Sequence, residues 1–499
     1  MRGRRNLALL IAGTCWVSLM AWVISASPRR VQPTTRGAEI RARSLKEIDD
    51  FVLAQGELDR FCSNPQTGKS VRPPGSLAND SIGREWCQFL IPRTPQDQSP
   101  RPSPRHLDDY PIETLEQLQK SLPPKTVAVA FSVSEGLLTR RLISPEGVET
   151  LGRRINWATT EHAIEMMRRS LSGKGTLATR ILLSILYDGL VSDWIGGIAR
   201  GTRIFFLPTG ALGEVPFCAL INRSSGKYLL EDYPSAVAPG PLELIAALQR
   251  DTALHEKSLG SALIVGDPSL SSRYPLPRLP GAAEEAESLG SVYRGLDTRL
   301  LLHRSATPAR VLSELGDADV VHLASHAIAD TRNPSLSVIF LSPDGSDSGI
   351  LFATDIALYP LDHTRLVVLD SCRSLEGIGR AGGMLGLAQS FLFAGVPAVV
   401  GNLWDVNDES PARLFVRFHQ EIRRGTDALE ALRIAQLEAK RSLVDENDWT
   451  WAGYEVLGGV IPRDPVRLII GSASQVRDQQ LSASLAAGRR LTPGREPAE

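Results

Sequence analysis

The 499-residue sequence has few cysteines, almost no net charge and no internal repeat. Its five cysteines lack C-x-x-C spacing, and structural zinc sites need paired ligands at close spacing, so no metal site is predicted. A formal net charge of −1 and a pI near 6.7 differ from the basic footprint of nucleic-acid-binding domains, so no nucleic-acid partner is expected. The lack of a repeat of fixed period argues against an attached solenoid.

The individual cysteines stand in different contexts. Cys218 lies in the apolar run Val215–Leu220 and is expected to be a buried core thiol. Cys62 and Cys87 could form a disulfide if that region faces an oxidising compartment. Cys372 differs from the others, because it follows directly on a β-branched apolar run and precedes a glycine-rich segment.

The first 27 residues are predicted to be a transmembrane anchor or a signal peptide. An uncharged, mostly apolar stretch runs from Leu7 to about Ala26, and about 20 such residues span the hydrocarbon core of a bilayer. Small residues at Ser25–Ser27 would suit cleavage, but the stretch is longer than a typical signal-peptide core, which favours an uncleaved anchor. We therefore expect a membrane-associated, single-pass protein, with a secreted or periplasmic protein as the alternative. Arginines on both sides leave the orientation open.

The rest of the chain divides by composition. Residues 28–109 are expected to form a juxtamembrane segment with a helix at Leu45–Cys62 and a proline-rich linker at Ile91–His106. Residues 473–499 contain no aromatic residue and are expected to be disordered. Between them, strand-like and helix-like runs alternate, which predicts an α/β fold with a mainly parallel sheet covered by helices.

Two of the strand-like runs end in residues whose side chains can act in catalysis. Leu366–Leu369 leads into Asp370, Ser371 and Cys372, and the run starting at Ala318 ends in His326. Parallel strands place their carboxyl ends at one edge of a sheet, where α/β folds hold their active sites. His326 and Cys372 lie 46 positions apart (372 − 326), close to the roughly 50-residue offset of caspase-type proteases. If the two strands are neighbours, a thiol nucleophile and its base meet.

Gly377–Gly382 formally matches the dinucleotide-binding pattern G-x-G-x-x-G. That motif also needs a turn tight against the strand and an acidic residue about 20 positions later. Here the segment begins five residues after Cys372, and only Asp405 is near the required offset. No cofactor is therefore predicted.

In its ordered set of motifs the chain resembles the CHAT domain family, which belongs to the caspase-like, separase-related clan of cysteine peptidases. The similarity covers roughly residues 120–460. The runs that carry it are Phe206–Phe217, Ala262–Pro268, Leu279–Ala286, His322–His326, Leu369–Arg373, Gly386–Gly395, Asn402–Asp408 and Trp451–Ala452. The resemblance implies a caspase-like three-layer α/β/α sandwich. Its pseudo-catalytic first half would span residues 110–260, and its catalytic second half residues 261–472.

The resemblance also implies the roles of the site residues. Cys372 would be the nucleophile and His326 the general base, which later protonates the leaving amine. The oxyanion would be stabilised by the backbone N–H groups of Cys372 and Ala327, where family members often have glycine in place of Ala327. His322, in the middle of its strand, is interpreted as a core histidine with internal hydrogen bonds.

Asp370 is predicted to bind substrate. Residues two apart on a strand share a face, so Asp370 points with Cys372, and metacaspases use an acid at this position for basic side chains. The alternative is an ion pair with an arginine of the chain: Arg365, Arg373 or Arg380. Asp405 is a second candidate for the substrate-binding acid.

The expected function is that of an endopeptidase that cleaves a protein or peptide substrate, with a preference for Arg or Lys before the scissile bond. Two alternatives remain open: a catalytically silent scaffold or interaction module of caspase fold, and thioester chemistry such as acyl transfer on the same dyad. A regulatory protein partner is compatible with either.

Overall fold

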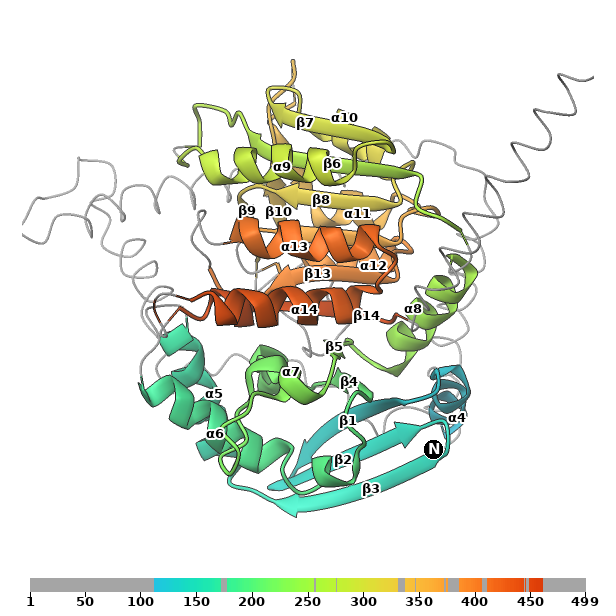
Figure 1. Ribbon diagram of the computed structural model, residues 1–499, viewed down its shortest axis with the longest axis vertical. Helices are drawn as coiled ribbons and strands as arrows, with labels where there is room; N and C mark the ends of the chain where they lie inside the picture. Colours follow the sequence, from blue (N-terminus) through green and yellow to red (C-terminus); the bar gives the residue numbers. More distant parts are fainter. Residues whose placement is uncertain are drawn as a thin grey trace, which may run out of the picture. The chain divides into compact units, whose positions relative to one another are not determined.

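The fold is described from a computed structural model (Figure 1). It describes residues 112–171, 177–254, 257–274, 276–330, 337–345, 347–371, 374–375, 386–405, 411–443, 445 and 448–460. All of these except Arg273 and Tyr274 belong to one compact unit. The predicted anchor, the linker segment, the Cys62–Cys87 pair, Cys372 and the tail lie outside the described residues. In the part that is described, no helix is long and apolar enough to cross a membrane.

An eleven-stranded sheet forms the centre of this unit, in the order β3-β2-β1-β4-β5-β14-β13-β12-β8-β6-β7, and a separate three-stranded sheet has the order β11-β10-β9. The strands are β1 (Thr126–Ser134), β2 (Leu137–Ser144), β3 (Gly147–Arg154), β4 (Arg203–Leu207), β5 (Ser235–Val237), β6 (Ser261–Pro268), β7 (Asp297–His303), β8 (Val320–Ala324), β9 (Ala327–Ile328), β10 (Val338–Phe340), β11 (Ile350–Phe352), β12 (Leu366–Asp370), β13 (Ala398–Asn402) and β14 (Tyr454–Gly458).

The large sheet contains two parallel blocks, and β2 and β3 extend it antiparallel beyond β1. The strands β1, β4, β5 and β14 pair in parallel, and so do β13, β12, β8, β6 and β7. The blocks join where β13 and β14 pair antiparallel. The predicted α/β fold with a mainly parallel sheet is thus confirmed, while the predicted domain boundary near residue 260 stays a prediction.

The central strands are buried and mostly apolar because both faces of the sheet are covered. All five residues of β8 and of β13 are buried, as are four of the five in β12. Near the outer edge, β1 and β2 form an antiparallel hairpin. Glu135 and Gly136 have φ values of +50° and +75°, which matches the two-residue turn that the twist of paired strands favours.

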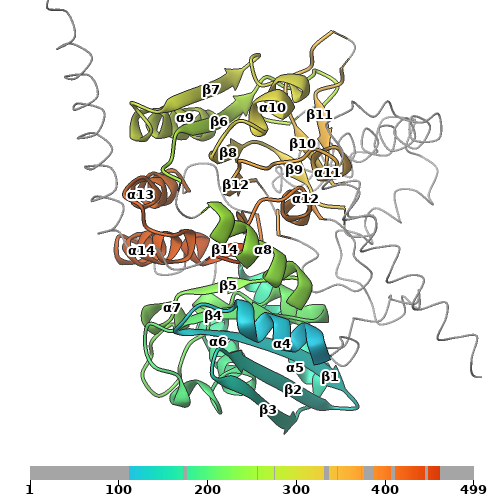
Figure 2. The same cartoon turned by 90° about the vertical axis from the view of Figure 1, so that its right-hand side faces the viewer.

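Helices cover both faces of the sheet. On one face lie α9, α13 and α14, and on the other lie α8 and α12 (Figures 1 and 2). The helices are α4 (Ile112–Ser121), α5 (Trp157–Leu171), α6 (Leu177–Leu190), α7 (Leu229–Asp232), α8 (Pro241–Leu254), α9 (Pro280–Val292), α10 (Pro308–Leu315), α11 (Ala353–Ala357), α12 (Leu387–Phe393), α13 (Pro411–Arg423) and α14 (Ala428–Arg441).

A buried ion pair connects the start of β4 with the start of α14. Arg203 Nη1 donates to Asp427 Oδ1 at 2.7 Å, and Nη2 donates to Oδ2 at 2.5 Å. Asp427 is also the N-cap of α14, where its carboxylate accepts the Leu429 and Glu430 N–H groups at 3.1 and 3.2 Å. The side chain of Asp427 is only 3% exposed. One carboxylate therefore holds together elements 224 residues apart in the sequence.

A buried carboxyl group lies on β14 beside the short helix η4 (Phe217–Ala219). Glu455 Oε1 accepts the Phe217 N–H at 3.0 Å. Burial raises the pKa of Glu455 to about 8, although the Phe217 N–H opposes this shift by favouring the charged form. The folded protein therefore holds a proton here that the unfolded chain, with a pKa of 4.5, releases.

We expect the free energy of unfolding to fall as pH rises from 4.5 to about 8 on account of Glu455. Glu455→Gln should remove this dependence and stabilise the protein at pH 8.5 by about 1–3 kcal/mol, since one pKa unit corresponds to about 1.4 kcal/mol. Urea unfolding at pH 5 and pH 8.5 measures the difference. Glu149→Gln, at an exposed position of β3, is the control, and equal responses of both variants would contradict the prediction.

Candidate active site

The strands that carry the predicted dyad are neighbours. β8 and β12 pair in parallel, and Ala324 stands opposite Asp370 in the register. His326 is two residues beyond Ala324, and Cys372 is two residues beyond Asp370. The predicted adjacency of the two strands is confirmed, whereas Cys372 itself lies outside the described residues. Both predicted catalytic positions therefore follow the same edge of the sheet at equal offsets.

The chain on both sides of Cys372 is tied to the sheet. Ser371 is buried directly after β12. On the other side, Ser374 Oγ donates to the Leu369 carbonyl at 3.3 Å and accepts the Asn402 N–H at 3.0 Å. The Leu375 N–H donates to the Asn402 carbonyl at 3.0 Å. These bonds hold Ser374 and Leu375 between β12 and β13.

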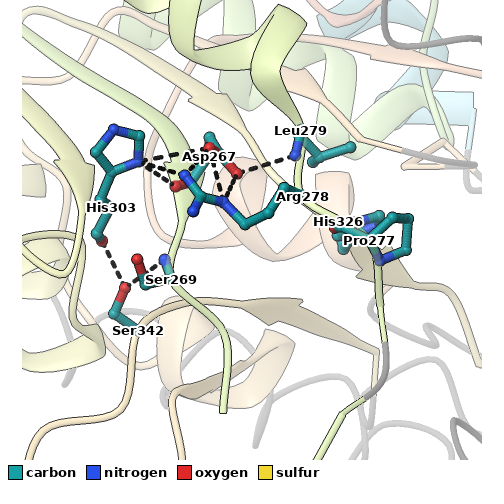
Figure 3. Close-up of polar contacts among 8 residues, drawn as sticks. All are labelled: Asp267, Ser269, Pro277, Arg278, Leu279, His303, His326 and Ser342. Carbon is teal, nitrogen blue, oxygen red and sulfur yellow. Dashed lines mark hydrogen bonds and ion pairs between the residues drawn. The ribbon is translucent and has the colours of Figure 1, made fainter. Parts of the chain in front are cut away.

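The imidazole of His326 is held by a backbone carbonyl. Its Nε2 lies 2.9 Å from the Pro277 oxygen (Figure 3). Because a carbonyl only accepts, Nε2 carries the proton, and in the neutral ring Nδ1 is then the atom with the lone pair. The His326 carbonyl accepts the Phe340 N–H at 2.9 Å, which ties the end of β8 to β10. This arrangement leaves Nδ1 with the basic role.

Ala327 begins β9, an edge strand of the small sheet. Ala327 stands opposite Ile339 in the register. The next pair along, His326 and Phe340, is hydrogen-bonded, because the Phe340 N–H donates to the His326 carbonyl. Bonded and non-bonded pairs alternate along an antiparallel ladder, so the backbone groups of Ala327 and Ile339 do not bond to each other. The Ala327 N–H therefore points away from β10. A donor in this position is compatible with the predicted oxyanion role, which stays a prediction.

Asp370 is half-buried at the end of β12, and its Oδ1 accepts the Tyr454 hydroxyl at 2.7 Å. Burial raises the pKa of Tyr454 well above its usual value, and the Asp370 charge raises it further. A neutral phenol orients the carboxylate without neutralising it.

The structure bears on one of the three arginines that were candidate ion-pair partners of Asp370. Arg365 lies at the opposite end of β12, where its Nε is 3.2 Å from Asp319 Oδ1. Arg373 and Arg380 lie outside the described residues. Asp405, the second candidate acid, is exposed just after the buried Trp404.

A chain of buried polar side chains connects His322 of β8 with α9 and α13, on the face of the sheet that these helices cover. His322 Nδ1 is 3.1 Å from His419 Nε2, and His419 Nδ1 is 2.8 Å from the Tyr293 hydroxyl. On the other side, His322 Nε2 is 2.7 Å from Glu285 Oε1. Burial lowers the pKa of His322 to about 4, although the Asp370 charge opposes the shift. The interpretation of His322 as a core histidine is confirmed.

Sequence reasoning missed the partners of His322. His419 could have been found, because it follows Phe415 by four residues and so falls on the apolar stripe of α13. Tyr293 and Glu285 offered no such signal. Within the described ranges, no group of three His, Cys, Asp or Glu side chains is arranged to hold a metal ion.

The comparison with protein families agrees with the motifs. The CHAT domain profile matches residues 178–459. The chain belongs to the CHAT domain family. Tetratricopeptide repeat protein 28 of Homo sapiens is 26% identical over 339 residues, which cover 58% of this chain and 14% of that protein. Its Mus musculus counterpart is 26% identical over 345 residues. This CHAT chain thus spans 14% of the length of these curated relatives.

Solved structures similar to this CHAT protein include the separase–securin complex of Saccharomyces cerevisiae. Its TM-score is 0.47 at 10% sequence identity, and the match covers 70% of this chain and 31% of that chain. Gingipain R, an Arg-specific cysteine proteinase, has a TM-score of 0.39 at 9% identity, covering 60% of this chain and 74% of that chain.

Proposed function

We propose that this CHAT protein is a cysteine endopeptidase of caspase-like type, with Cys372 as nucleophile and His326 as general base. The observation that carries the proposal is the parallel register of β8 and β12, from which both residues follow at the same offset. Membership of the CHAT domain family supports it further.

In the proposed reaction, Nδ1 of His326 takes the proton of the Cys372 thiol, and the thiolate attacks the scissile carbonyl carbon. The N–H groups of Ala327 and Cys372 stabilise the oxyanion of the tetrahedral intermediate. His326 then protonates the leaving amine as the C–N bond breaks. Water, deprotonated by the same imidazole, hydrolyses the thioester and releases the acid product and the free thiol.

We propose that the substrate is a protein or peptide with Arg or Lys before the scissile bond. The Asp370 carboxylate, oriented by Tyr454, supplies the charge for this recognition. Asp405, exposed after β13, is the second acid that could contribute.

Peptide cleavage tests this proposal. Fluorogenic peptides with Arg, Lys, Asp or Leu before the scissile bond are incubated with the wild type and with Cys372→Ala. We expect cleavage of the Arg and Lys peptides and a loss of at least about 10³-fold in Cys372→Ala, because covalent catalysis loses its nucleophile. Cleavage that survives this substitution would exclude Cys372 as the nucleophile.

Two further variants serve as matched controls in the same assay. Cys218→Ala should keep its activity, since that thiol is buried and burial raises its pKa well above the usual value. Asp370→Asn should reduce cleavage of the Arg and Lys peptides relative to the Leu peptide. A wild type that cleaves none of the peptides would favour the catalytically silent alternative.

A further inference from the structure

The carbonyl that holds His326 belongs to a short segment without secondary structure ahead of α9. Pro277 supplies this carbonyl, and Arg278 and Leu279 connect it to the helix at Pro280. Both prolines restrict the backbone, because their φ angles are fixed. The position of the His326 imidazole therefore depends on how firmly this segment is held.

A buried carboxylate anchors the two residues that follow Pro277. Arg278 Nε lies 3.0 Å from both carboxylate oxygens of Asp267, and Arg278 Nη2 also donates to Oδ2. The Leu279 N–H donates to Asp267 Oδ1 at 2.9 Å. Burial opposes ionisation of Asp267, but the Arg278 guanidinium and the Leu279 N–H outweigh it and lower the pKa of the carboxyl. The carboxylate thus binds the segment through both a side chain and the backbone.

The contacts of Asp267 and Arg278 extend to the end of β7 and, from there, to the chain just after β10 (Figure 3). His303, at the end of β7, places its Nδ1 2.9 Å from Arg278 Nη2 and 3.2 Å from the Asp267 carbonyl oxygen. The His303 carbonyl accepts the Ser342 hydroxyl at 2.5 Å, and Ser342 Oγ accepts the Ser269 N–H at 2.9 Å. Asp267 and His303 both have left-handed backbone, with φ values of +43° and +51°, although neither is glycine. Such strain persists only where the surroundings enforce it, and it gathers at functional sites.

We propose that Arg278 is a positioning residue. Held by Asp267 and His303, it fixes the Pro277 carbonyl and thereby keeps the His326 proton on Nε2 and the lone pair on Nδ1. The catalytic consequence rests on the proposed peptidase function, whereas the effect on His326 does not. The Arg278 side chain is 59% exposed, and without it the buried Asp267 carboxylate still accepts the Leu279 N–H. Its loss should therefore affect the imidazole much more than the fold.

The ¹⁵N chemical shifts of the His326 ring test the proposal directly. The full-length protein is labelled with ¹⁵N-histidine, and the His326 signals are assigned by their loss in His326→Gln. We expect the wild type to show the Nε2–H tautomer and Arg278→Ala to show a mixture of both tautomers. Asp267→Asn, in which asparagine tolerates left-handed backbone, should give an intermediate result. An unchanged tautomer in Arg278→Ala would overturn the proposal.

Kinetics provide the second readout. Arg278→Ala should lower kcat about 10- to 100-fold with KM changed less than about threefold, since a small misplacement of a catalytic group costs up to about 10²-fold. Arg299→Ala is the matched control, because Arg299 also pairs with acids at the surface, Glu314 among them, but has no bond to the Pro277 segment. Equal kcat in Arg278→Ala and Arg299→Ala would count against positioning. A wild type without any cleavage would count against the peptidase function, while the tautomer still decides the role of Arg278.

Discussion

His326→Gln is expected to reduce peptide cleavage by about 10²–10⁴-fold, the range of general acid–base catalysis, with little change in thermal stability. Glutamine can still donate to the Pro277 carbonyl through its amide, so this hydrogen bond has a replacement. It cannot take up or return a proton, so the proposed general base is lost. Initial rates on the Arg peptide, together with thermal unfolding, measure both effects.

His322→Gln is the matched control, because His322 lies within β8, four residues before His326. It removes a buried imidazole that contacts His419 and Glu285, so we expect a loss of about 1–3 kcal/mol in stability from the polar groups left without a partner. Activity per folded molecule should persist. If His326→Gln kept its activity while His322→Gln lost it, the assignment of the base would be wrong.

Asp427→Ala is expected to cost about 3–5 kcal/mol of unfolding free energy, the range for breaking a buried ion pair by removing one partner. The substitution leaves the Arg203 guanidinium buried without its carboxylate and also removes the N-cap of α14. Urea unfolding followed by circular dichroism measures the loss.

Thr307→Ala is the comparison for Asp427→Ala, because Thr307 caps α10 by accepting the Arg310 N–H but has no ionic partner there. The cap alone should cost about 1 kcal/mol. Asp427→Asn, which keeps a capping oxygen and loses the charge, should fall between the two. A similar cost for Asp427→Ala and Thr307→Ala would mean that the ion pair adds nothing to the cap.

The sequence predicted those parts of the site that depend on the pattern of apolar and polar residues within one strand. The apolar runs of β8 and β12 each end in a small polar stretch, which marks a strand that opens at a sheet edge. Their direct pairing was a condition of the dyad hypothesis, and the parallel register fulfils it. The buried state of His322 followed from its position in the middle of the strand.

The parts that sequence reasoning missed depend on contacts between distant segments. Tyr454 meets Asp370 across 84 residues, and the Pro277 carbonyl meets His326 across 49. A backbone carbonyl has no residue-type signature, so no pattern could have pointed to it. The short strands β5 and β14 were also not predicted, because three to five residues show too little periodicity to distinguish a strand from a loop.

The position of β14 between β5 and β13 has a consequence for biosynthesis. This strand follows every other strand of the sheet along the chain, yet it fills the gap between the two parallel blocks. A nascent polypeptide that has not yet delivered residues 454–458 to its neighbours has two open strand edges in its middle, and open edges invite association with other chains. The phenol that orients Asp370 arrives with the same segment. Completion of the sheet and of the contact between Tyr454 and Asp370 is thus postponed until translation of this region has finished.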